Sequence, residues 1–298
     1  MRVGVIGLGD MGSGLAKNLI AAGYEVAGCD LDPKRVAAFE ALGGQVAADP
    51  AAVGAGAEAV FVMVMTGAQA QAVVLGERGL VQGLKSGAAV ILTATVPAAT
   101  ARTLARGLEG TGIVFIDSPV SGGFPGAQSG TLTLMVSAEA GVLDRFRPVL
   151  EAVSATIHPV GSAPGMGQTV KACLQSLIGG IFGATFEAAA LAAKAGVPGE
   201  VLHRVVSTSS AGCGAANTAL ENIIDRKFQG TGSHIATMHK DLTISLDMAR
   251  DLGVPLHMAA AAMQLFQAGK TKYPDGDNWI VTRVIEEIVG AELHRSAS

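Results

Sequence analysis

Lys171 and Gln175 are the residues of the central part of the chain whose types suit proton transfer and substrate orientation. They stand four apart in a proline-free, largely apolar stretch over residues 165–196. Residues four apart share one face of a helix, so the two side chains are expected to lie together. A lysine exchanges a proton near neutral pH when burial lowers its pKa. By its sequence position alone, however, an ordinary solvated lysine explains Lys171 better, and a chemical role needs further support.

A glycine-rich segment near the N-terminus has the spacing of a dinucleotide-binding loop. It follows a short β-branched run over residues 3–6 and opens a helical pattern with apolar residues at positions 11, 15 and 19. In such a loop the first glycine permits a tight turn, the second admits a pyrophosphate, and the third allows close helix packing. The phosphates bind at the positive end of the helix. The residues expected to hold the cofactor here are Gly7, Leu8, Gly9, Asp10, Met11 and Gly12.

Asp30 lies where a carboxylate would accept hydrogen bonds from the adenosine ribose. It ends the second apolar run, over residues 25–29, and follows Gly7 at the usual distance along the chain. The alternative is that Asp30 only ends a strand. Position 31 is leucine, and no cation adjoins Asp30 in the sequence, which favours NAD over NADP. Asp32, followed by proline, has the pattern of a helix N-cap.

Further alternating strand and helix patterns follow, and two of them end in residues expected to contact the cofactor. Strands are expected over residues 59–65, 89–92 and 113–116, with helices over 69–75 and 97–108. Ligands bind beyond the carboxyl ends of parallel strands, which places Met65 and Thr95 at the cofactor. For Thr95, a capping role at the next helix is equally consistent with the sequence.

A loop rich in glycine and proline, over residues 117–126, is a candidate anion site. The backbone N–H groups of Gly122 and Gly123 and the hydroxyl of Ser121 suit a carboxylate. A purely structural turn explains these glycines equally well. Strands over 131–136 and 156–160, with a helix over 140–153 between them, are expected to complete this half of the chain.

The second half reads as helical throughout, which predicts two domains of different class. We expect an α/β, doubly wound Rossmann-type domain over residues 1–162, then an all-α domain over 163–298 built around one long central helix. That helix, if continuous over residues 165–196, is about 48 Å long. Its glycines and alanines suit close helix contact, and we expect the helix to lie at an interface in a homodimer or homotetramer. Further helices are expected over 199–206, 220–224, 234–252, 256–266 and 279–289, with a loop over 207–214.

Composition excludes several classes of partner. The 298 residues carry a net charge of −4 with no basic run, which argues against nucleic acid and against an anionic membrane surface. Three cysteines without metal spacing suit a reduced cytoplasmic protein, and the scattered histidines predict no metal site. The most apolar part of the central stretch, residues 172–186, is short for a membrane span, and Asp10 interrupts any N-terminal signal pattern. We expect a soluble protein whose partners are a small carboxylate substrate and other copies of itself.

Four motifs together resemble the β-hydroxyacid dehydrogenase family, which includes 3-hydroxyisobutyrate dehydrogenase, tartronate semialdehyde reductase and L-threonate dehydrogenase. They are the glycine loop over 7–12, the Asp-Ser-Pro-Val-Ser-Gly-Gly run over 117–123 with Gly-Thr-Leu at 130–132, the Gly-Met-Gly-Gln-Thr-Val-Lys run over 165–171, and Lys-Asp-Leu at 240–242. Their order and spacing match the family over nearly the whole chain.

The resemblance implies a function and a set of roles. It implies a catalytic role for Lys171, a substrate-carboxylate role for Ser121, Gly122 and Gly123, and a cofactor-side role for Lys240. The expected reaction is NAD-dependent hydride transfer involving a small 3-hydroxycarboxylic acid or its semialdehyde. The chain departs from the family pattern after the lysine: Leu174 replaces a usual asparagine, while Gln175 keeps an amide that can orient substrate, as the tartronate semialdehyde reductase branch implies.

Two other functions stay open from the sequence. One is an NADPH-dependent reductase of tartronate semialdehyde, succinic semialdehyde or glyoxylate, against which Asp30 and Leu31 count. The other is a catalytically silent dinucleotide-binding module, which has no need of Lys171 in this motif. The decarboxylating phosphogluconate relatives have a much longer helical domain, and the imine reductases lack the lysine.

Overall fold

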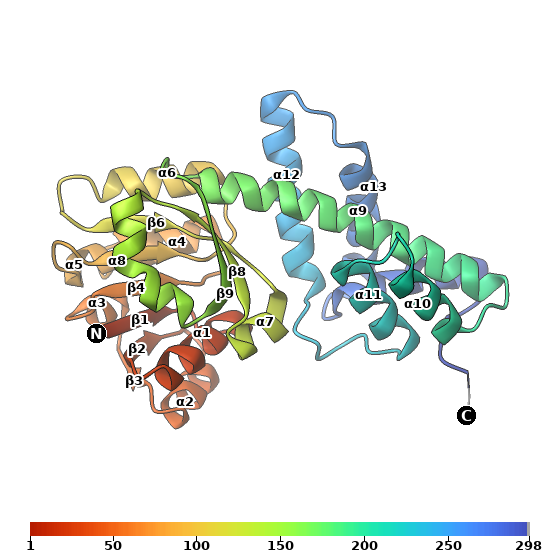
Figure 1. The fold of residues 1–298 in the computed structure, drawn as a ribbon, viewed down its shortest axis with the longest axis horizontal. Coiled ribbons are helices and arrows are strands. Elements are labelled where there is room, and N and C mark those ends of the chain that lie inside the picture. The colour runs from red at the N-terminus through yellow and green to blue at the C-terminus, as the bar shows by residue number, and fades with distance from the viewer. Residues whose placement is uncertain (297–298) are drawn as a thin grey trace. The chain divides into compact units, whose positions relative to one another are not determined.

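The computed structural model describes residues 1–296, and its contacts divide the chain into two compact units. The first is Met1–Lys171 and the second is Ala172–Ser298. The first unit is α/β and the second is helical, as expected from the sequence (Figure 1). The long helix α9, Met166–Lys194, begins in the first unit and continues through the second.

A mixed sheet forms the centre of the first unit. Its strand order is β3-β2-β1-β4-β5-β6-β8-β7, and β9 lies beside β8. The neighbours from β3 to β6 are parallel, whereas β8 runs antiparallel to β6 and β7 and parallel to β9. Because the chain leaves β1 first toward β2 and later toward β4, the order reverses at β1, where α/β sheets bind ligands. The strands are β1 Arg2–Ile6, β2 Glu25–Cys29, β3 Gln45–Val46, β4 Ala59–Val62, β5 Ala89–Leu92, β6 Val114–Asp117, β7 Val120–Ser121, β8 Leu132–Ser137 and β9 Ser154–Gly161.

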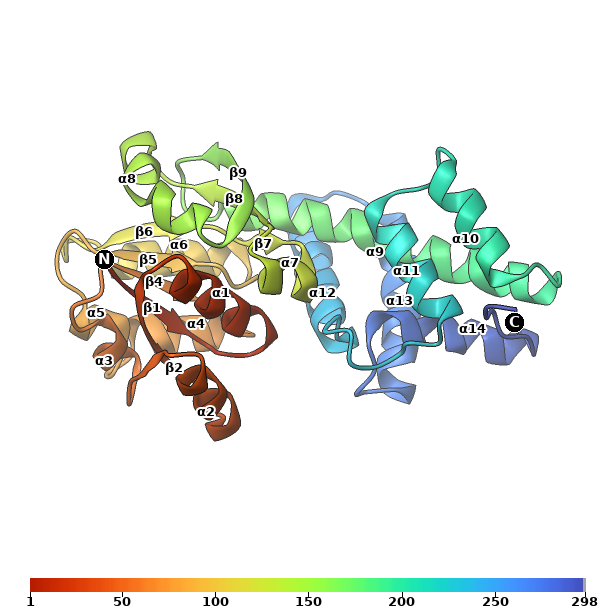
Figure 2. The ribbon, with the colours of Figure 1, turned by 60° about the horizontal axis from the view of Figure 1, so that its bottom comes forward.

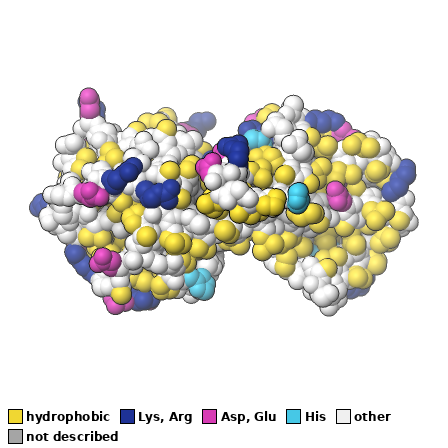
Figure 3. All heavy atoms as spheres, turned by 90° about the horizontal axis from the view of Figure 1, so that it is seen from above, with side chains coloured by type: hydrophobic (Ala, Val, Ile, Leu, Met, Phe, Trp, Pro, Cys, Tyr) yellow, Lys and Arg dark blue, Asp and Glu magenta, His cyan; other side chains and the backbone are white. Residues whose placement is uncertain are grey.

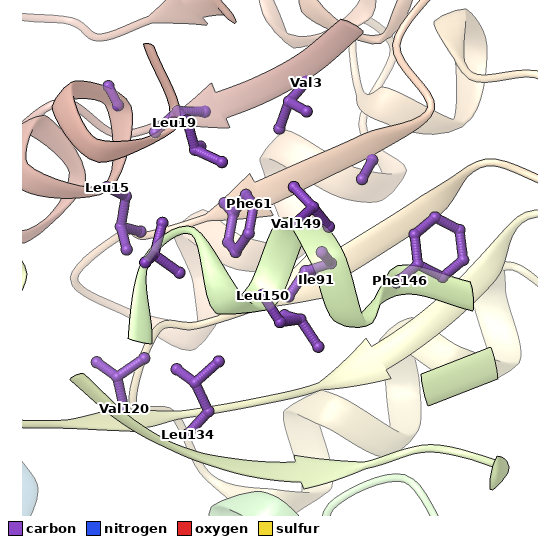
Figure 4. Close-up of a cluster of buried hydrophobic side chains, with 14 of the residues drawn as sticks. Val3, Leu15, Leu19, Phe61, Ile91, Val120, Leu134, Phe146, Val149 and Leu150 are labelled. Carbon is purple, nitrogen blue, oxygen red and sulfur yellow. The ribbon is translucent and has the colours of Figure 1, made fainter. Parts of the chain in front are cut away.

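Helices cover both faces of this sheet, so its central strands are apolar on both sides. On one face Phe61 and Ile91 pack with Leu15 of α1 and Phe146 of α8, as Figure 4 shows. The opposite face buries a second cluster that includes Val60. The helices contributing to the first face are α1 Asp10–Ala21, α2 Pro33–Ala41, α7 Gly123–Ser129 and α8 Ala140–Glu151; those of the second are α3 Pro50–Gly54, α4 Gly67–Leu75, α5 Leu80–Gly83 and α6 Ala98–Gly107.

The second unit packs its helices around α9 through aromatic side chains and close glycine contacts. Phe182 of α9 meets Trp279 edge to face, with ring centroids 5.3 Å apart. A Cβ on Gly179 would lie 2.5 Å from Leu242, so this glycine permits the close approach of α12. Figure 2 shows these helices, which are α10 Gly199–Thr208, α11 Gly214–Ile224, α12 Ile235–Leu252, α13 His257–Lys272 and α14 Thr282–Val289. The 3₁₀ turn Asn278–Val281 directly precedes α14.

The structure corrects the sequence analysis in the expected loop over residues 117–126. This segment contains the short strand β7 and the start of helix α7. Glycine and proline density suggested a loop, but α7 packs closely on α1: a Cβ on Gly14 would lie 2.6 Å from the backbone of Ala127. The short elements β3, α3 and α5 were also not expected, because helices of four or five residues are too short to show a helical period and a strand of two residues shows no apolar run.

Helix α9 is the one helix within residues 1–296 that is long and apolar enough to cross a membrane by length and composition alone. In its most apolar window, 44% of the residues are buried inside the protein. The core helix of a soluble protein passes the same test, and Phe182 and Phe186 of α9 pack in the helical core.

Candidate active site

Two glycines of the N-terminal loop are required by the backbone itself. Gly7 has a φ of +86°, and a Cβ there would lie 2.2 Å from the Met63 carbonyl oxygen. A Cβ on Gly12 would lie 1.8 Å from the Gly7 carbonyl oxygen, so α1 packs directly against the turn. Gly9, the N-cap of α1, is different: a Cβ there would meet nothing closer than Arg35 at 3.6 Å. The space beside Gly9 is thus where a ligand can approach the backbone.

Asp30 lies beside this loop and is held in place by two backbone groups. Its Oδ2 accepts a hydrogen bond from the Leu8 N–H at 2.7 Å, and its Oδ1 accepts one from the Asp32 N–H at 2.9 Å. The side chain of Asp32 caps α2 by accepting from the Lys34 N–H, as its sequence pattern predicted. The loop and Asp30 therefore form one connected element at the carboxyl ends of β1 and β2.

The structure reveals a cation that the sequence analysis missed. Arg35 Nη1 lies 3.7 Å from Asp30 Oδ2, and Arg35 Nε lies 3.7 Å from Asp32 Oδ2. No cation adjoins Asp30 in the sequence, but the expectation is wrong for the folded protein. The first turn of α2 places Arg35 beside the end of β2. The argument for NAD that rested on a missing cation is weakened accordingly.

Met65 and Thr95 follow the carboxyl ends of β4 and β5, at the sheet edge where the cofactor was expected. Met65 is half-exposed, and its N–H donates to Gln69 Oε1 at 3.0 Å within the capping box that starts α4. The N-cap residue of α6 is Pro97, two residues after Thr95, and both roles of Thr95 stay predictions.

Ser121, Gly122 and Gly123 lie at the junction of β7 and α7. Ser121 is the last residue of β7 and pairs with Thr133 of β8. Gly122 and Gly123 have φ values of 128° and 58°, which favour glycine at both positions. The backbone turn is therefore enough to explain both glycines. The expected binding of a carboxylate by Ser121, Gly122 and Gly123 stays a prediction.

Asp117 and Gln168 form a buried hydrogen-bonded pair that the sequence analysis did not recognise as a unit. Asp117 Oδ1 accepts from Gln168 Nε2 at 2.8 Å, and Asp117 Oδ2 accepts from the N–H groups of Gly165 at 2.9 Å and Gln168 at 3.3 Å. Burial raises the pKa of the Asp117 carboxyl, and these hydrogen bonds oppose part of that rise. A carboxylate thus satisfies N–H groups at the start of α9.

Gln168 also ties the start of α9 to the segment that follows β5. Its Oε1 accepts from the Val96 N–H at 3.0 Å, and its Nε2 donates to the Ala94 carbonyl at 3.1 Å. Lys171 comes one helical turn later in the same unit, with only 6% of its surface exposed. The alternative of an ordinary solvated lysine is therefore wrong.

In the second unit, Gln175 has a partner in Asp241, a residue that the sequence analysis did not single out. Gln175 Nε2 donates to Asp241 Oδ2 at 2.6 Å, and both side chains are buried. Lys240 Nζ lies 2.7 Å from Asp241 Oδ1. Its place in the Lys-Asp-Leu motif could have identified Asp241 as a candidate site residue. The burial of its side chain on an amphipathic helix is not predictable from one sequence.

Both parts of the chain match a family model. Residues 2–161 match the NAD binding domain of 6-phosphogluconate dehydrogenase, and residues 165–285 match the helical region described as NAD-binding of NADP-dependent 3-hydroxyisobutyrate dehydrogenase. The chain belongs to the β-hydroxyacid dehydrogenase family. It is an NAD(P)-dependent hydroxyacid dehydrogenase with a Rossmann-type domain and a helical domain, as the motif resemblance implied.

Similar family members span nearly the same length as this chain. L-threonate dehydrogenase of Escherichia coli K12 is 35% identical over 96% of this chain and 95% of its own length. The 3-hydroxyisobutyrate dehydrogenase of Pseudomonas aeruginosa is 33% identical over 89% of this chain and 90% of its own length. A crystal structure of 3-hydroxyisobutyrate dehydrogenase from Salmonella typhimurium is 31% identical, covers 95% of this chain and 99% of that one, and has a TM-score of 0.87.

Proposed function

We propose that the protein catalyses NAD-dependent hydride transfer between a small 3-hydroxycarboxylic acid and its semialdehyde. The observation that carries this proposal is the burial of Lys171 one turn after the Asp117–Gln168 pair, inside the family motif. Burying the amino group of a lysine costs desolvation free energy, which a catalytic role would explain. A protein that only binds a dinucleotide does not need a buried lysine beside the Asp117–Gln168 pair.

The chain's residues fit the chemistry of hydride transfer. NAD, when bound along the 7–12 loop, Asp30, Met65, Thr95 and Lys240, supplies a hydride acceptor. As hydride leaves the carbinol carbon, Lys171 Nζ takes the hydroxyl proton and the C–O bond becomes a carbonyl; in reduction Lys171 returns that proton. Ser121, Gly122 and Gly123 bind the substrate carboxylate, and Gln175 orients the substrate.

For the cofactor, we propose NAD rather than NADP. Asp30 accepts hydrogen bonds from the ribose hydroxyls, and its charge repels a 2′-phosphate. Arg35 is shared between the carboxylates of Asp30 and Asp32, which offset its charge. The same arginine is the specific observation that favours the second candidate, an NADPH-dependent reductase of tartronate semialdehyde, succinic semialdehyde or glyoxylate, because it could turn to a 2′-phosphate.

We also propose that the protein is a cytoplasmic homodimer or homotetramer. The second unit exposes large apolar side chains, with exposed fractions of 62% at Leu177, 71% at Leu191 and 79% at Ile288. Figure 3 shows hydrophobic side chains gathered on one face of this unit. Apolar patches of this kind are typical of subunit interfaces.

The test of function is NADH formation by the purified protein with 3-hydroxyisobutyrate, L-threonate, D-glycerate and 3-hydroxypropionate. We expect turnover of at least one acid, at a higher kcat/KM with NAD than with NADP. A panel that stays silent with both cofactors, while the protein still binds NAD, would contradict the proposal and favour a binding module.

A further inference from the structure

A hollow in the first unit lies at the edge of the sheet opposite to the glycine loop. It has a volume of about 300 Å³, which is at the lower end of the range for small-molecule sites. Its walls are residues 56–58 before β4, residues 85–88 before β5, and Arg145 of α8. Because β1, β4 and β5 are parallel, this is their amino end, which Figure 1 marks by the N-terminus. The five residues of β1 separate it from the glycine loop by about 13 Å.

Three cationic side chains surround the hollow. Lys85 and Arg145 line it. Arg2, the first residue of β1, borders it, because a Cβ on Gly56 would lie 3.6 Å from Arg2 Nη1. A Cβ on Gly87 would lie 3.7 Å from both terminal nitrogens of Arg145. The two guanidinium groups are therefore close to the backbone of two loops, and no side chain fills the space at either glycine.

The positive charge of these side chains has little compensation from the protein. Within the part of the chain that the structure describes, Arg2, Lys85 and Arg145 form no ion pair. Arg2 Nε is buried there without a hydrogen-bond partner. Glu58 is the acidic residue of the wall, and its Oε1 lies 4.0 Å from the amino group of Met1. The chain as a whole carries a net charge of −4, so this excess of cations is local.

We propose that this hollow is a binding site for a small phosphate dianion, separate from the cofactor and substrate sites. Arginine presents planar N–H donors that match phosphate oxygens, and lysine adds a point charge. A phosphate group has oxygens in several directions, so it can contact cations from β1, from α8 and from the segment before β5 at once. It also offsets the charge of Arg2, which the protein leaves unpaired. Inorganic phosphate and phosphate esters share this chemistry.

Thermal unfolding of the protein with inorganic phosphate tests this site. The dinucleotide cofactor is kept at saturation, because the glycine loop is itself expected to bind phosphate groups, and sodium chloride holds the ionic strength constant. We expect about 20 mM phosphate to raise the Tm by roughly 2–4 °C, since a ligand that binds the folded state stabilises it. Acetate at the same concentration should leave the Tm unchanged, because a monoanion pairs with fewer of the cations.

Two variants remove one cation each from an exposed side chain, Lys85→Gln and Arg145→Gln. Each should lose at least about half of the phosphate-dependent rise in Tm, and the double variant should lose all of it. The matched control is Arg147→Gln, also on α8, whose guanidinium pairs with Asp144 at 3.4 Å. This control should keep the wild-type rise. A general effect of phosphate as a salt acts on every variant alike, so the difference between variants is the readout.

Glycerol 3-phosphate, tested in the same way, separates the two sources of the phosphate group. A larger rise in Tm than with inorganic phosphate identifies an ester as the preferred ligand of the site. An equal or smaller rise identifies free phosphate.

Three results would overturn the inference. They are a wild-type Tm that phosphate does not raise, an equal rise with acetate, and a rise that Lys85→Gln and Arg145→Gln both retain. None of these measurements involves turnover of a hydroxyacid, so their failure leaves the proposed function standing.

Discussion

At the scale of single residues, the choice of cofactor depends on one carboxylate and one guanidinium at the end of β2. Asp30 is 2.7 Å from the Leu8 N–H and 3.7 Å from Arg35. The same carboxylate thus positions the glycine loop and offsets the charge of the nearest cation. Removing the Asp30 carboxylate should therefore change the binding of both cofactors, and it should weaken NAD more than NADP.

We predict that Asp30→Ala lowers the ratio of kcat/KM for NAD to that for NADP by about tenfold, a change of roughly 1.4 kcal/mol. The substitution removes the acceptor of the ribose hydroxyls and releases Arg35 for a 2′-phosphate. Arg35→Ala is the matched control and should raise the ratio instead. An unchanged ratio in Asp30→Ala would refute the assignment of Asp30 to the ribose.

A second residue-scale prediction concerns pH. Burial raises the pKa of Asp117 above its usual value, so the native protein binds this proton at a higher pH than the unfolded chain does. The contribution of Asp117 to the free energy of unfolding is therefore greatest below the unfolded pKa and decreases as pH rises through the native pKa.

Urea unfolding of the wild type and of Asp117→Asn over the acidic to neutral range measures this contribution, because other titrating groups cancel in the difference. We expect the stability of the wild type relative to the variant to decrease as pH rises. An increase with pH would show that the hydrogen bonds from Gln168 and Gly165 outweigh burial.

At the scale of elements, the start of α9 is anchored by one side chain. Gln168 is 1% exposed and bonds to the segment that follows β5 and to Asp117, the last residue of β6. We predict that Gln168→Leu lowers the free energy of unfolding by roughly 2–4 kcal/mol, because it leaves buried polar groups unpaired. The same change should lower kcat at least about tenfold, because Lys171 follows one turn later.

Gln71→Leu, an exposed position on α4, is the matched control and should change stability by less than about 0.5 kcal/mol. Equal stability of Gln168→Leu and the control would show that the Gln168 contacts do not anchor α9. If stability falls but kcat is unchanged, the anchor does not position Lys171.

Elements with strong periodicity were predictable from the sequence, and those set by tertiary contacts were not. The helix α12 and the long helix α9 follow from residue patterns over many positions, and β5 follows from its continuous apolar run. The helix α7 was read as a loop because its stability depends on packing against Gly14 of α1, which local composition does not reveal.

At the scale of the whole molecule, the succession of an α/β unit and a helical unit along the chain was predictable, because the change from alternating patterns to helical ones is strong. Motif spacing also identified the residues proposed for the site. The partners of those residues were not predicted. Arg35 meets Asp30 through the turn from β2 into α2, and Asp241 meets Gln175 through the packing of α12 on α9. A single sequence does not specify which polar residues meet.

The account of the whole enzyme rests on Lys171, which by contacts is the last residue of the first unit. The most direct measurement is the kcat of Lys171→Ala with the best acid of the panel, together with its Kd for NAD. We predict that turnover falls by at least about a hundredfold while the Kd for NAD stays near the wild-type value, because the lysine moves a proton and does not hold the cofactor. Turnover near the wild-type rate would remove Lys171 from the mechanism and contradict the central claim.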